Sequence, residues 1–408
     1  MRRPSKSQDG TEYGAPPRAR SRAALDSPRR RRRAAMRIAR VETIPLKLPV
    51  KTPLVESGGT FAAFDHVIVK LHAEDGRVGL GEVEAYPSFE RPGVETQAGI
   101  LAIIRDHLGP AAQGESPFDL GRIWARMDKA VNSYCRVKAA IDIACHDLMG
   151  QKLGVPVVDL LGGKLRDSYL VEGVGYGISI GEPEEVARQA KDAVARGYRQ
   201  LELKAGETPA RDAARLHLVR AAIGREIPIK IDFNGFYDTK TAIRLIRELE
   251  EYGIEWIEQP ARPWDLEGLA MVRSAVGTTI VVDESAETPE EMMRVVRAGA
   301  ADAVHVKPTI KGGFTMARRI VAVAEAAGIA IVPGTSAPTG VGMAAAQAFI
   351  CASRELSGGA HGSPLDILVD DVITEPIPAD STRVHARSGP GLGIALDEAK
   401  IARYRADR

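Results

Sequence analysis

The sequence is poor in cysteine and aromatic residues, and it lacks the long apolar run of a membrane helix. The 408 residues include three cysteines, at positions 135, 145 and 351, with no Cys-x-x-Cys spacing. This argues against a disulfide scaffold and against a cysteine-based zinc site. Aromatic side chains make up 5% of the chain, and no apolar stretch reaches the ~18 residues that a membrane-spanning helix needs. We therefore expect an enzyme-sized protein with an aliphatic core, located in the cytoplasm and without a membrane partner.

A strong charge of one sign is also lacking, since the formal net charge is +1, but the charge is unevenly spread. Residues 1–35 hold 11 Lys or Arg and three Asp or Glu, whereas the remaining 373 residues carry a net charge of −7. The first segment is rich in Pro and Arg without apolar periodicity, so we predict a disordered, dispensable basic tail over 1–35. The run Arg29–Arg33 has the charge to bind nucleic acid, yet blocks of like charge are commonly solvated tails. We predict no nucleic-acid partner.

The rest of the chain divides into three regions of different pattern. Residues 36–162 read as strands followed by helices, the order of an α+β module. Residues 163–365 alternate short apolar runs with amphipathic segments, which predicts βαβ units and a parallel sheet. A doubly wound sheet and a closed barrel both fit, but seven recognisable strands and an eighth near 356–364, in about 200 residues, favour the barrel. We expect residues 366–408 to return to the N-terminal module.

Acidic or basic residues end five consecutive predicted strands of this barrel. They are Lys204, Asp232, Glu258, Asp283 and Lys307, separated by 28, 26, 25 and 24 residues, one βα unit each. In a parallel barrel, catalytic groups lie at the carboxyl ends of the strands. A strand-end carboxylate can also simply cap the next helix, but five such residues in succession are hard to explain by packing alone. The pattern predicts an active site.

The types of these residues indicate proton transfer at a metal site. Three carboxylates brought close together repel one another unless a cation joins them, and an all-oxygen site suits Mg²⁺ or Mn²⁺. Lys204 and Lys307 lie four strands apart in a ring of eight, so they should face each other across the bound substrate. A metal that holds a substrate carboxylate stabilises the enediolate formed when the neighbouring carbon loses a proton. The metal and partial burial should lower a lysine pKa from about 10.4, so that a neutral amine serves as base.

Six motifs, taken together, resemble those of the muconate lactonizing enzyme subgroup. This subgroup belongs to the mandelate racemase/muconate lactonizing enzyme family within the enolase superfamily, and the resemblance covers 36–408. The motifs are LKAG at 203–206, DFNG at 232–235, IEQP at 257–260, VDES at 282–285, HVKPTIKGG at 305–313 and LLGGKLRD at 160–167. The resemblance implies an α/β fold, a (β/α)7β modified TIM barrel with an N-terminal α+β capping domain. It makes Asp232, Glu258 and Asp283 ligands of Mg²⁺ (or Mn²⁺), and Lys204 and Lys307 the acid/base pair. Asn234 would be a supporting polar group near the metal.

One departure from the family pattern lies on the second barrel strand. Where the family has Lys-x-Lys, this chain has Glu202-Leu203-Lys204. Residues two apart on a strand point the same way, so Glu202 should face the barrel interior beneath Lys204. A carboxylate there would favour protonated Lys204. We hypothesise that Glu202 instead pairs with Lys230, which stands two before Asp232 on the neighbouring strand. A plain core ion pair would be equally compatible with activity.

The second departure concerns the end of the site that would select the substrate. Muconate cycloisomerases carry a Glu near the eighth strand and dipeptide epimerases an Asp-x-Asp pair, whereas this chain has Ala360 and His361. His361 is predicted either to contact substrate or to be a solvated loop residue. Two cap loops, around 54–61 and 86–89, should close the site. The predicted substrate contacts are Asn234, Glu56, Phe61, Tyr86, Phe89, Thr335, Ser336 and His361.

Three functions remain open on the sequence alone. The first is a Mg²⁺-dependent isomerase that abstracts the proton next to the carboxylate of a small acid, in cycloisomerisation or in racemisation or epimerisation. The second is an acid-sugar or hydroxy-acid dehydratase that uses the same enediolate. The third is a non-catalytic barrel scaffold anchored by the tail. We expect a small carboxylate as substrate and a homo-oligomer as the assembled form.

Overall fold

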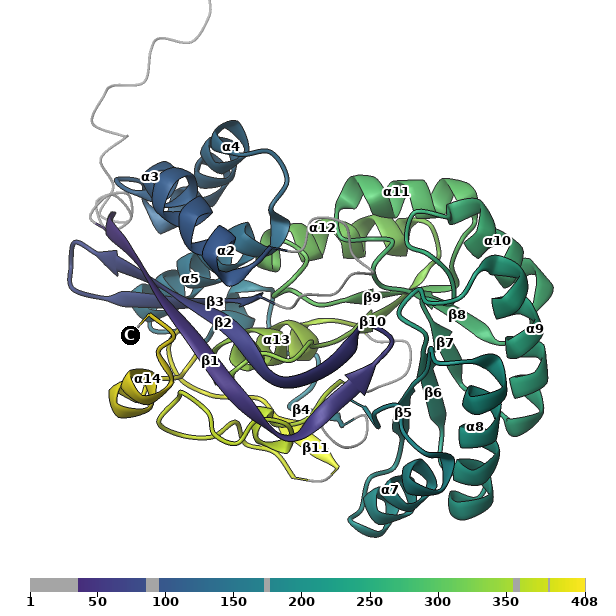
Figure 1. Ribbon diagram of the computed structural model, residues 1–408. Helices are drawn as coiled ribbons and strands as arrows, with labels where there is room; N and C mark the ends of the chain where they lie inside the picture. The colour runs from purple at the N-terminus through teal and green to yellow at the C-terminus, as the bar shows by residue number, and fades with distance from the viewer. Residues whose placement is uncertain (1–35, 86–94, 172–176, 355–359, 381, 408) are drawn as a thin grey trace, which may run out of the picture.

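The computed structural model describes residues 36–85, 95–171, 177–354, 360–380 and 382–407. A curved antiparallel sheet and its helices stand beside a ring of parallel strands with helices on its outer side (Figure 1). Among the described helices, none is both long and apolar enough to cross a membrane.

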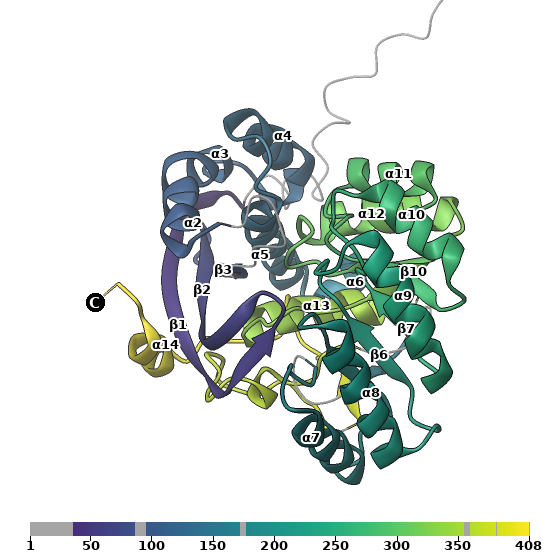
Figure 2. The same ribbon diagram turned by 45° about the vertical axis from the view of Figure 1, so that its right-hand side comes forward.

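The N-terminal sheet has three antiparallel strands in chain order. They are β1 (Ile38–Glu56), β2 (Gly59–Ala73) and β3 (Val78–Ala85). The turn between β2 and β3 contains Gly76 at φ +86°, a backbone conformation that side-chain-bearing residues rarely adopt. The tips of β1 and β2 bend toward the parallel strands (Figure 2). The predicted order of strands before helices in this region is confirmed.

A long alanine-rich helix lies directly against this sheet. α5 (Cys135–Leu153) is buried along almost its whole length. A Cβ atom at Gly81 would lie 2.0 Å from the carbonyl oxygen of Ala140, and one at Gly79 would lie 2.2 Å from that of Ala144. The two glycines of β3 therefore allow the close approach of helix and strand. The other N-terminal helical segments are α2 (Gln97–Ile103), η2 (Ile104–Leu108), α3 (Gly109–Ala112), η3 (Pro117–Asp119), α4 (Leu120–Ala130) and α6 (Val157–Leu160).

Six parallel strands follow one another in space in the order of the chain. They are β5 (Leu201–Lys204), β6 (Ile229–Asp232), β7 (Trp256–Glu258), β8 (Thr279–Val282), β9 (Ala303–Val306) and β10 (Ala330–Pro333). A doubly wound sheet would reverse the strand order at one point, and these strands do not. The order therefore confirms the predicted barrel. The associated helical segments are α7 (Pro183–Ala195), α8 (Pro209–Ile223), α9 (Thr239–Leu249), η4 (Glu250–Tyr252), α10 (Leu266–Ala275), α11 (Pro289–Ala298), α12 (Gly313–Ala326) and α13 (Gly340–Ala352).

The first and eighth predicted barrel strands are represented by short contacts. Ile178 bridges Leu203 of β5, and Val171 bridges Ala360, both in parallel. Residues 172–176 and 355–359, which carry parts of these two predictions, lie outside the described residues. Directly before Val171, β4 (Ser168–Leu170) pairs with β11 (Arg383–His385).

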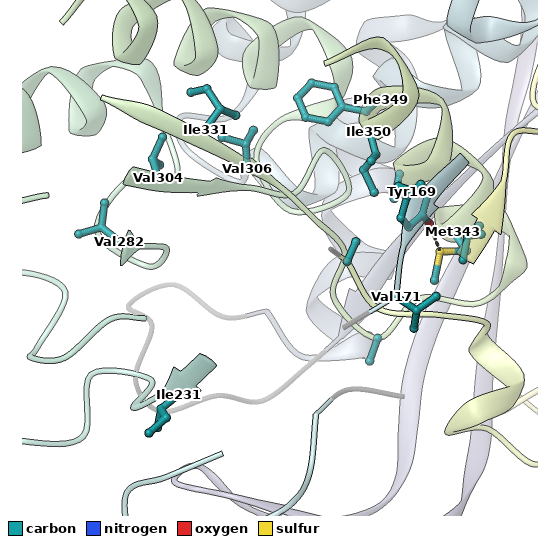
Figure 3. Packing of buried hydrophobic residues seen from close by; sticks show 14 of the residues in the cluster. Tyr169, Val171, Ile231, Val282, Val304, Val306, Ile331, Met343, Phe349 and Ile350 are labelled. Atoms are coloured by element: carbon teal, nitrogen blue, oxygen red, sulfur yellow. Dashed lines mark hydrogen bonds between the residues drawn. The ribbon is translucent and has the colours of Figure 1, made fainter. Parts of the chain in front are cut away.

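Side chains on the outer face of the parallel strands form the aliphatic core. Figure 3 shows Val282, Val304 and Ile331 in this core, with Phe349 and Ile350 of α13 nearby. The Tyr169 hydroxyl donates to Met343 Sδ at 3.8 Å. Because strand residues alternate between faces, the same strands direct Glu202, Lys230 and His305 to the inner side. Burying the outer set fixes the register that orients the inner set.

The C-terminal residues run back along the N-terminal module. Val50 bridges Leu368 and Leu46 bridges Arg405, and Lys70 pairs with Glu398 at 3.0 Å. This segment contains η5 (Pro364–Asp366) and α14 (Glu398–Tyr404). It therefore ties the sheet to the far end of the chain.

Buried carboxylates join the N-terminal module to the barrel. Glu82 of β3 accepts from Thr339 N at 2.8 Å, Thr339 Oγ1 at 2.7 Å and Gly342 N at 2.7 Å. Its Oε1 also lies 2.8 Å from His66 Nδ1. Burial alone would raise the pKa of Glu82, but the His66 imidazole and these donors hold it below its usual value. Glu82 is thus an ionised link to the start of α13.

We expect Glu82→Ala to lower the free energy of unfolding by about 3 kcal/mol or more, because several buried donors lose their acceptor at once. Urea unfolding followed by circular dichroism would measure it. Glu248→Ala, at an exposed position on α9, should change stability by less than about 0.5 kcal/mol. Equal, small effects of the two changes would contradict this account of the link.

Candidate active site

The five predicted strand-end groups meet in one buried cluster. Lys204 ends β5, Asp232 ends β6, Glu258 ends β7, and Asp283 and Lys307 follow β8 and β9 directly. None is more than 4% exposed. The Lys204 Nζ lies 2.9 Å from Asp232 Oδ2, and the Lys307 Nζ lies 2.8 Å from Asp283 Oδ2 and 3.6 Å from Glu258 Oε1. Lys204 therefore contacts a carboxylate from the neighbouring strand β6, and Lys307 contacts carboxylates from the ends of β7 and β8.

The tightest group of potential metal ligands differs from the predicted one. Within the described part of the chain, Glu258, Asp283 and His305 place ligand atoms within 4.8 Å of one another. Asp232 is outside that group, and its Oδ2 accepts from Lys204 and from Asn234 Nδ2. That all three predicted carboxylates hold one metal ion stays a prediction.

His305 was missed in the sequence, although a signal for it was present. It stands two residues before Lys307, so the alternation of a strand places both on the same face. Its Nδ1 lies 2.9 Å from Glu258 Oε1. Gly334 directly follows β10. A Cβ atom there would lie 1.8 Å from His305 Nε2, so the glycine leaves room for the imidazole. Such a hydrogen bond orients a carboxylate that could bind a metal.

The electrostatics of the cluster favour an added cation. Burial raises the pKa of Asp232 to about 8; Lys204 opposes this rise, while the carboxylates of Glu258 and Glu284 add to it. Burial likewise raises the pKa of Glu258 to about 7, against the effect of Lys307 and with that of Asp283. Burial is the main cause of both rises, so a cation that joins these carboxyls would favour their ionised forms. The donor set, oxygen atoms with one imidazole nearby, fits Mg²⁺ or Mn²⁺.

Two residues with strained backbone hold the carboxylates in place. Asn234 at φ 44° and Gln259 at φ 39° adopt the left-handed conformation that non-glycine residues disfavour. Asn234 Nδ2 donates to Asp232 Oδ2 at 2.9 Å and to Glu284 Oε1 at 3.2 Å. Gln259 Oε1 accepts from Asp283 N at 3.0 Å. Asn234 is thus in contact with a predicted ligand, and such strain is typical of functional sites.

Lys311 is a second buried lysine next to Asp283. Its Nζ lies 2.9 Å from Asp283 Oδ1 and donates to the carbonyl oxygens of Asp283 and Ala286 at 2.8 and 3.1 Å. It is 0% exposed. Lys311, Gln259 and Glu284 were not among the predicted site residues, although each lies within one of the motifs HVKPTIKGG, IEQP and VDES.

The predicted pairing of Glu202 with Lys230 is wrong. Glu202 Oε1 lies 2.6 Å from Lys204 Nζ, and its Oε2 lies 3.2 Å from His361 Nε2. Lys230 and Glu202 are partners in the strand register. However, the Lys230 Nζ donates to Gln200 Oε1 at 3.1 Å and lies 3.9 Å from the centre of the Trp256 ring. The lysine side chain therefore turns away from Glu202 toward a cation–π contact deeper in the barrel.

The tip of the β1–β2 hairpin lies over the loop that follows Lys204. Ile180 N donates to Val55 O at 2.9 Å, and a Cβ atom at Gly206 would come within 2.7 Å of Ser57 Cβ. Glu56 is buried at this tip, and the Phe61 ring stacks on Phe64 with centres 6.0 Å apart. The structure therefore brings the first predicted cap loop to the barrel. Tyr86 and Phe89, of the second, lie outside the described residues.

The loop after β10 is held from three sides. Ser336 Oγ donates to Glu84 of β3 and lies 3.2 Å from Thr309 Oγ1, and Thr335 Oγ1 accepts from His361 N at 3.2 Å. His361 is 3% exposed, so the alternative of a solvated loop residue is wrong. Substrate contact by Thr335, Ser336, His361, Glu56, Phe61 and Asn234 stays a prediction.

Comparison with known proteins places most of the chain in one family. Residues 38–162 match the model "Mandelate racemase / muconate lactonizing enzyme, N-terminal domain", and residues 185–400 match "Enolase C-terminal domain-like". The chain is 31% identical to the N-succinyl-L-Arg/Lys racemase of Bacillus cereus, over 89% of this chain and 96% of the relative. It is 33% identical to muconate cycloisomerase 1 of Rhodococcus opacus, over 88% and 96%.

Solved structures agree with this placement. The crystal structure of the N-succinyl Arg/Lys racemase from Bacillus cereus aligns with a TM-score of 0.85 at 28% identity, over 91% of this chain and 98% of that one. That of 2-chloromuconate cycloisomerase from Rhodococcus opacus aligns with a TM-score of 0.86 at 29% identity, over 91% and 100%. These alignments confirm the predicted modified TIM barrel with an N-terminal capping domain.

A divalent cation should stabilise the protein more at high pH than at low pH. The carboxyls of Asp232 and Glu258 have raised pKa values of about 8 and about 7, against 3.8 and 4.5 normally. Without metal, their contribution to stability is complete below about pH 4 and is lost as the pH rises through 7 and 8, because the folded state binds more protons than the unfolded chain. Mg²⁺ bound to these carboxylates would replace those protons and remove this loss.

Thermal unfolding in EDTA and in Mg²⁺, between about pH 6 and about pH 8.5, would measure this difference. We expect the gain in melting temperature from Mg²⁺ to grow steadily with pH, and to disappear in Asp232→Asn/Glu258→Gln. A gain independent of pH, or one retained in the double variant, would show that the metal binds elsewhere.

Proposed function

The chain belongs to the mandelate racemase/muconate lactonizing enzyme family of the enolase superfamily, and we propose that it is a Mg²⁺-dependent isomerase that removes the proton next to the carboxylate of a small acid. The observation that carries this proposal is the placement of two buried lysines, Lys204 and Lys307, at a carboxylate cluster from strands β5 and β9. Relatives that support the isomerase type include a racemase, epimerases and cycloisomerases.

The three strand-end carboxylates would hold the metal. Asp232, Glu258 and Asp283 would be the ligands, with His305 orienting Glu258 through its Nδ1 contact of 2.9 Å. When bound, the cation would supply positive charge to the substrate carboxylate and lower the cost of the enediolate. Gln259 and Lys311 keep the backbone and carboxylate of Asp283 in place. The roles of the protein groups follow from this arrangement.

The two lysines would move the proton. One amine would take the proton from the carbon next to the substrate carboxylate, and the other would return a proton from the opposite side, which inverts the centre. Because Lys204 and Lys307 come from strands four apart in the ring, this transfer favours racemisation or epimerisation. In cycloisomerisation, one substrate carboxylate would instead add to a conjugated double bond and close the lactone ring, and a single lysine would give its proton to the carbon next to the other carboxylate. The β1–β2 hairpin over Gly206 would exclude water and so protect the enediolate from the solvent.

We expect solvent deuterium to enter a substrate next to its carboxylate. The full chain with Mg²⁺ in D₂O would be tested by proton NMR against N-acylated amino acids, dipeptides, hydroxy acids, sugar acids and lactones. Exchange with inversion would identify a racemase or epimerase, and a new lactone ring a cycloisomerase. Loss of water would identify the dehydratase.

Lysine variants would locate the chemistry. Lys204→Arg and Lys307→Arg keep the positive charge but remove the amine, so each should lower the exchange rate by at least about 100-fold. Lys240→Arg, at an exposed position on α9, should leave the rate unchanged. Exchange that persists in both site variants would refute the proposed roles of the lysines, and its absence with every acid would refute the reaction.

Removal of residues 1–35 tests whether the protein is instead a tethered scaffold. We expect the shortened chain to keep the exchange rate and the Mg²⁺ stabilisation of the full chain, because β1 begins at Ile38. Loss of exchange with intact folding would contradict this expectation.

A further inference from the structure

A buried imidazole from the eighth-strand region lies below Lys204. His361 Nε2 lies 3.2 Å from Glu202 Oε2, and its Nδ1 lies 3.2 Å from the carbonyl oxygen of Ser336. The ring is held in place further by the bond from His361 N to Thr335 Oγ1. Neither ring contact reaches a metal ligand or solvent, so this histidine is distinct from His305 in position and partners.

Both ring nitrogens of His361 face oxygens that only accept. A backbone carbonyl has no proton to donate, and neither has an ionised carboxylate. Burial opposes the ionisation of Glu202, but the charge of Lys204, 2.6 Å away, holds its pKa well below the usual value. Glu202 is therefore a carboxylate, and each ring nitrogen of His361 must carry a hydrogen to satisfy its contact. A histidine with two N–H groups is an imidazolium cation.

The Glu202 carboxylate connects this cation to Lys204. Its Oε1 lies 2.6 Å from Lys204 Nζ while its Oε2 faces His361. A Cβ atom at residue 177 would lie 3.2 Å from Glu202 Oε1, so Gly177 gives the carboxylate its space. The Lys204 Nζ lies 2.9 Å from Asp232 on its other side. Cation and carboxylate thus alternate from the eighth-strand region to the end of β6.

We propose that His361, as an imidazolium, and Glu202 form a positioning pair that fixes Lys204 beside Asp232. This inference rests on the proposed function, in which Lys204 touches the substrate. Without the His361 charge, Glu202 would be a buried carboxylate whose one cationic partner in this row is Lys204, and the amine would be drawn toward Glu202. With that charge, Glu202 is neutralised from below and acts as a fixed support for the lysine.

Other charged groups near His361 belong to three further elements. Glu84 of β3 contacts Ser336, whose carbonyl oxygen faces the ring. Asp366 of η5 lies next to Gly362, at 2.6 Å from the position of an added Cβ. Lys204 of β5 is the cation on the other side of Glu202.

The protonation of His361 can be measured without a substrate. The full chain with Mg²⁺, labelled with ¹⁵N-histidine, would be studied by NMR at about neutral pH, and His361→Gln would assign the signal. We expect His361 to show two protonated ring nitrogens, and Glu202→Gln to convert it to a neutral ring. A neutral His361 in the unaltered chain, or an imidazolium unaffected by Glu202→Gln, would overturn the proposal.

The positioning role has a kinetic signature. On an acid that shows exchange, His361→Gln and Glu202→Gln should each lower kcat by about 10- to 100-fold and change KM by less than about twofold. The double variant, which removes both charges, should lose less than the product of the two single losses. His217→Gln, on the exposed face of α8, is the matched control and should leave kcat unchanged.

The outcomes separate this inference from the proposed function. Changes in KM alone would make His361 a substrate contact, and independent losses in the double variant would make the pair merely structural; either result overturns the proposal. If no acid exchanges, the proposed function fails, and the NMR result still decides the state of His361.

Discussion

The burial of many charged side chains at one end of the barrel is the constraint on which the rest of the structure depends. Asp232, Glu258, Asp283, Lys204 and Lys307 are all nearly inaccessible to water. Removing a charge from water costs several kcal/mol unless a partner of opposite charge or a set of donors replaces the lost hydration. Each of these groups therefore has its own partners, and burial still raises the pKa values of Asp232 and Glu258 in spite of the neighbouring lysines. A divalent cation bound by these carboxylates would supply positive charge at this position.

The same physics holds the two modules together away from the site. Glu82 and Asp371 accept from backbone N–H groups at the start of α13, and Asp147 of α5 accepts from Leu80 N and Leu392 N. Each of these carboxylates is buried and draws together segments that are far apart in the sequence. Cap, barrel and C-terminal segment are thus joined by directional bonds to the backbone, which fix the cap hairpin over the loop that follows Lys204.

Much of this arrangement could be predicted from the sequence, because the parallel barrel has a strict repeat. One charged residue per βα unit placed Lys204, Asp232, Glu258, Asp283 and Lys307 at strand ends, and period-two alternation placed Glu202 on the inner face. The partner of Glu202 could not be predicted this way. Lys230 is its neighbour in register, but the side chain of Lys230 is long enough to reach Trp256 instead, while His361 approaches from the other end of the chain. The rotamer of Lys230 and the closure of the barrel decide which side chains contact Glu202. The spacing of residues along a strand predicts neither of them.

In the proposed function, the strand-end carboxylates form a single divalent-cation site between two lysines. A crystal structure of the full chain grown with Mg²⁺ tests it most directly. The proposal predicts one ion bound by Asp232, Glu258 and Asp283, with Lys204 and Lys307 on opposite sides of it. An ion bound elsewhere, or a cluster that excludes the ion while both lysines remain paired with the carboxylates, would contradict it.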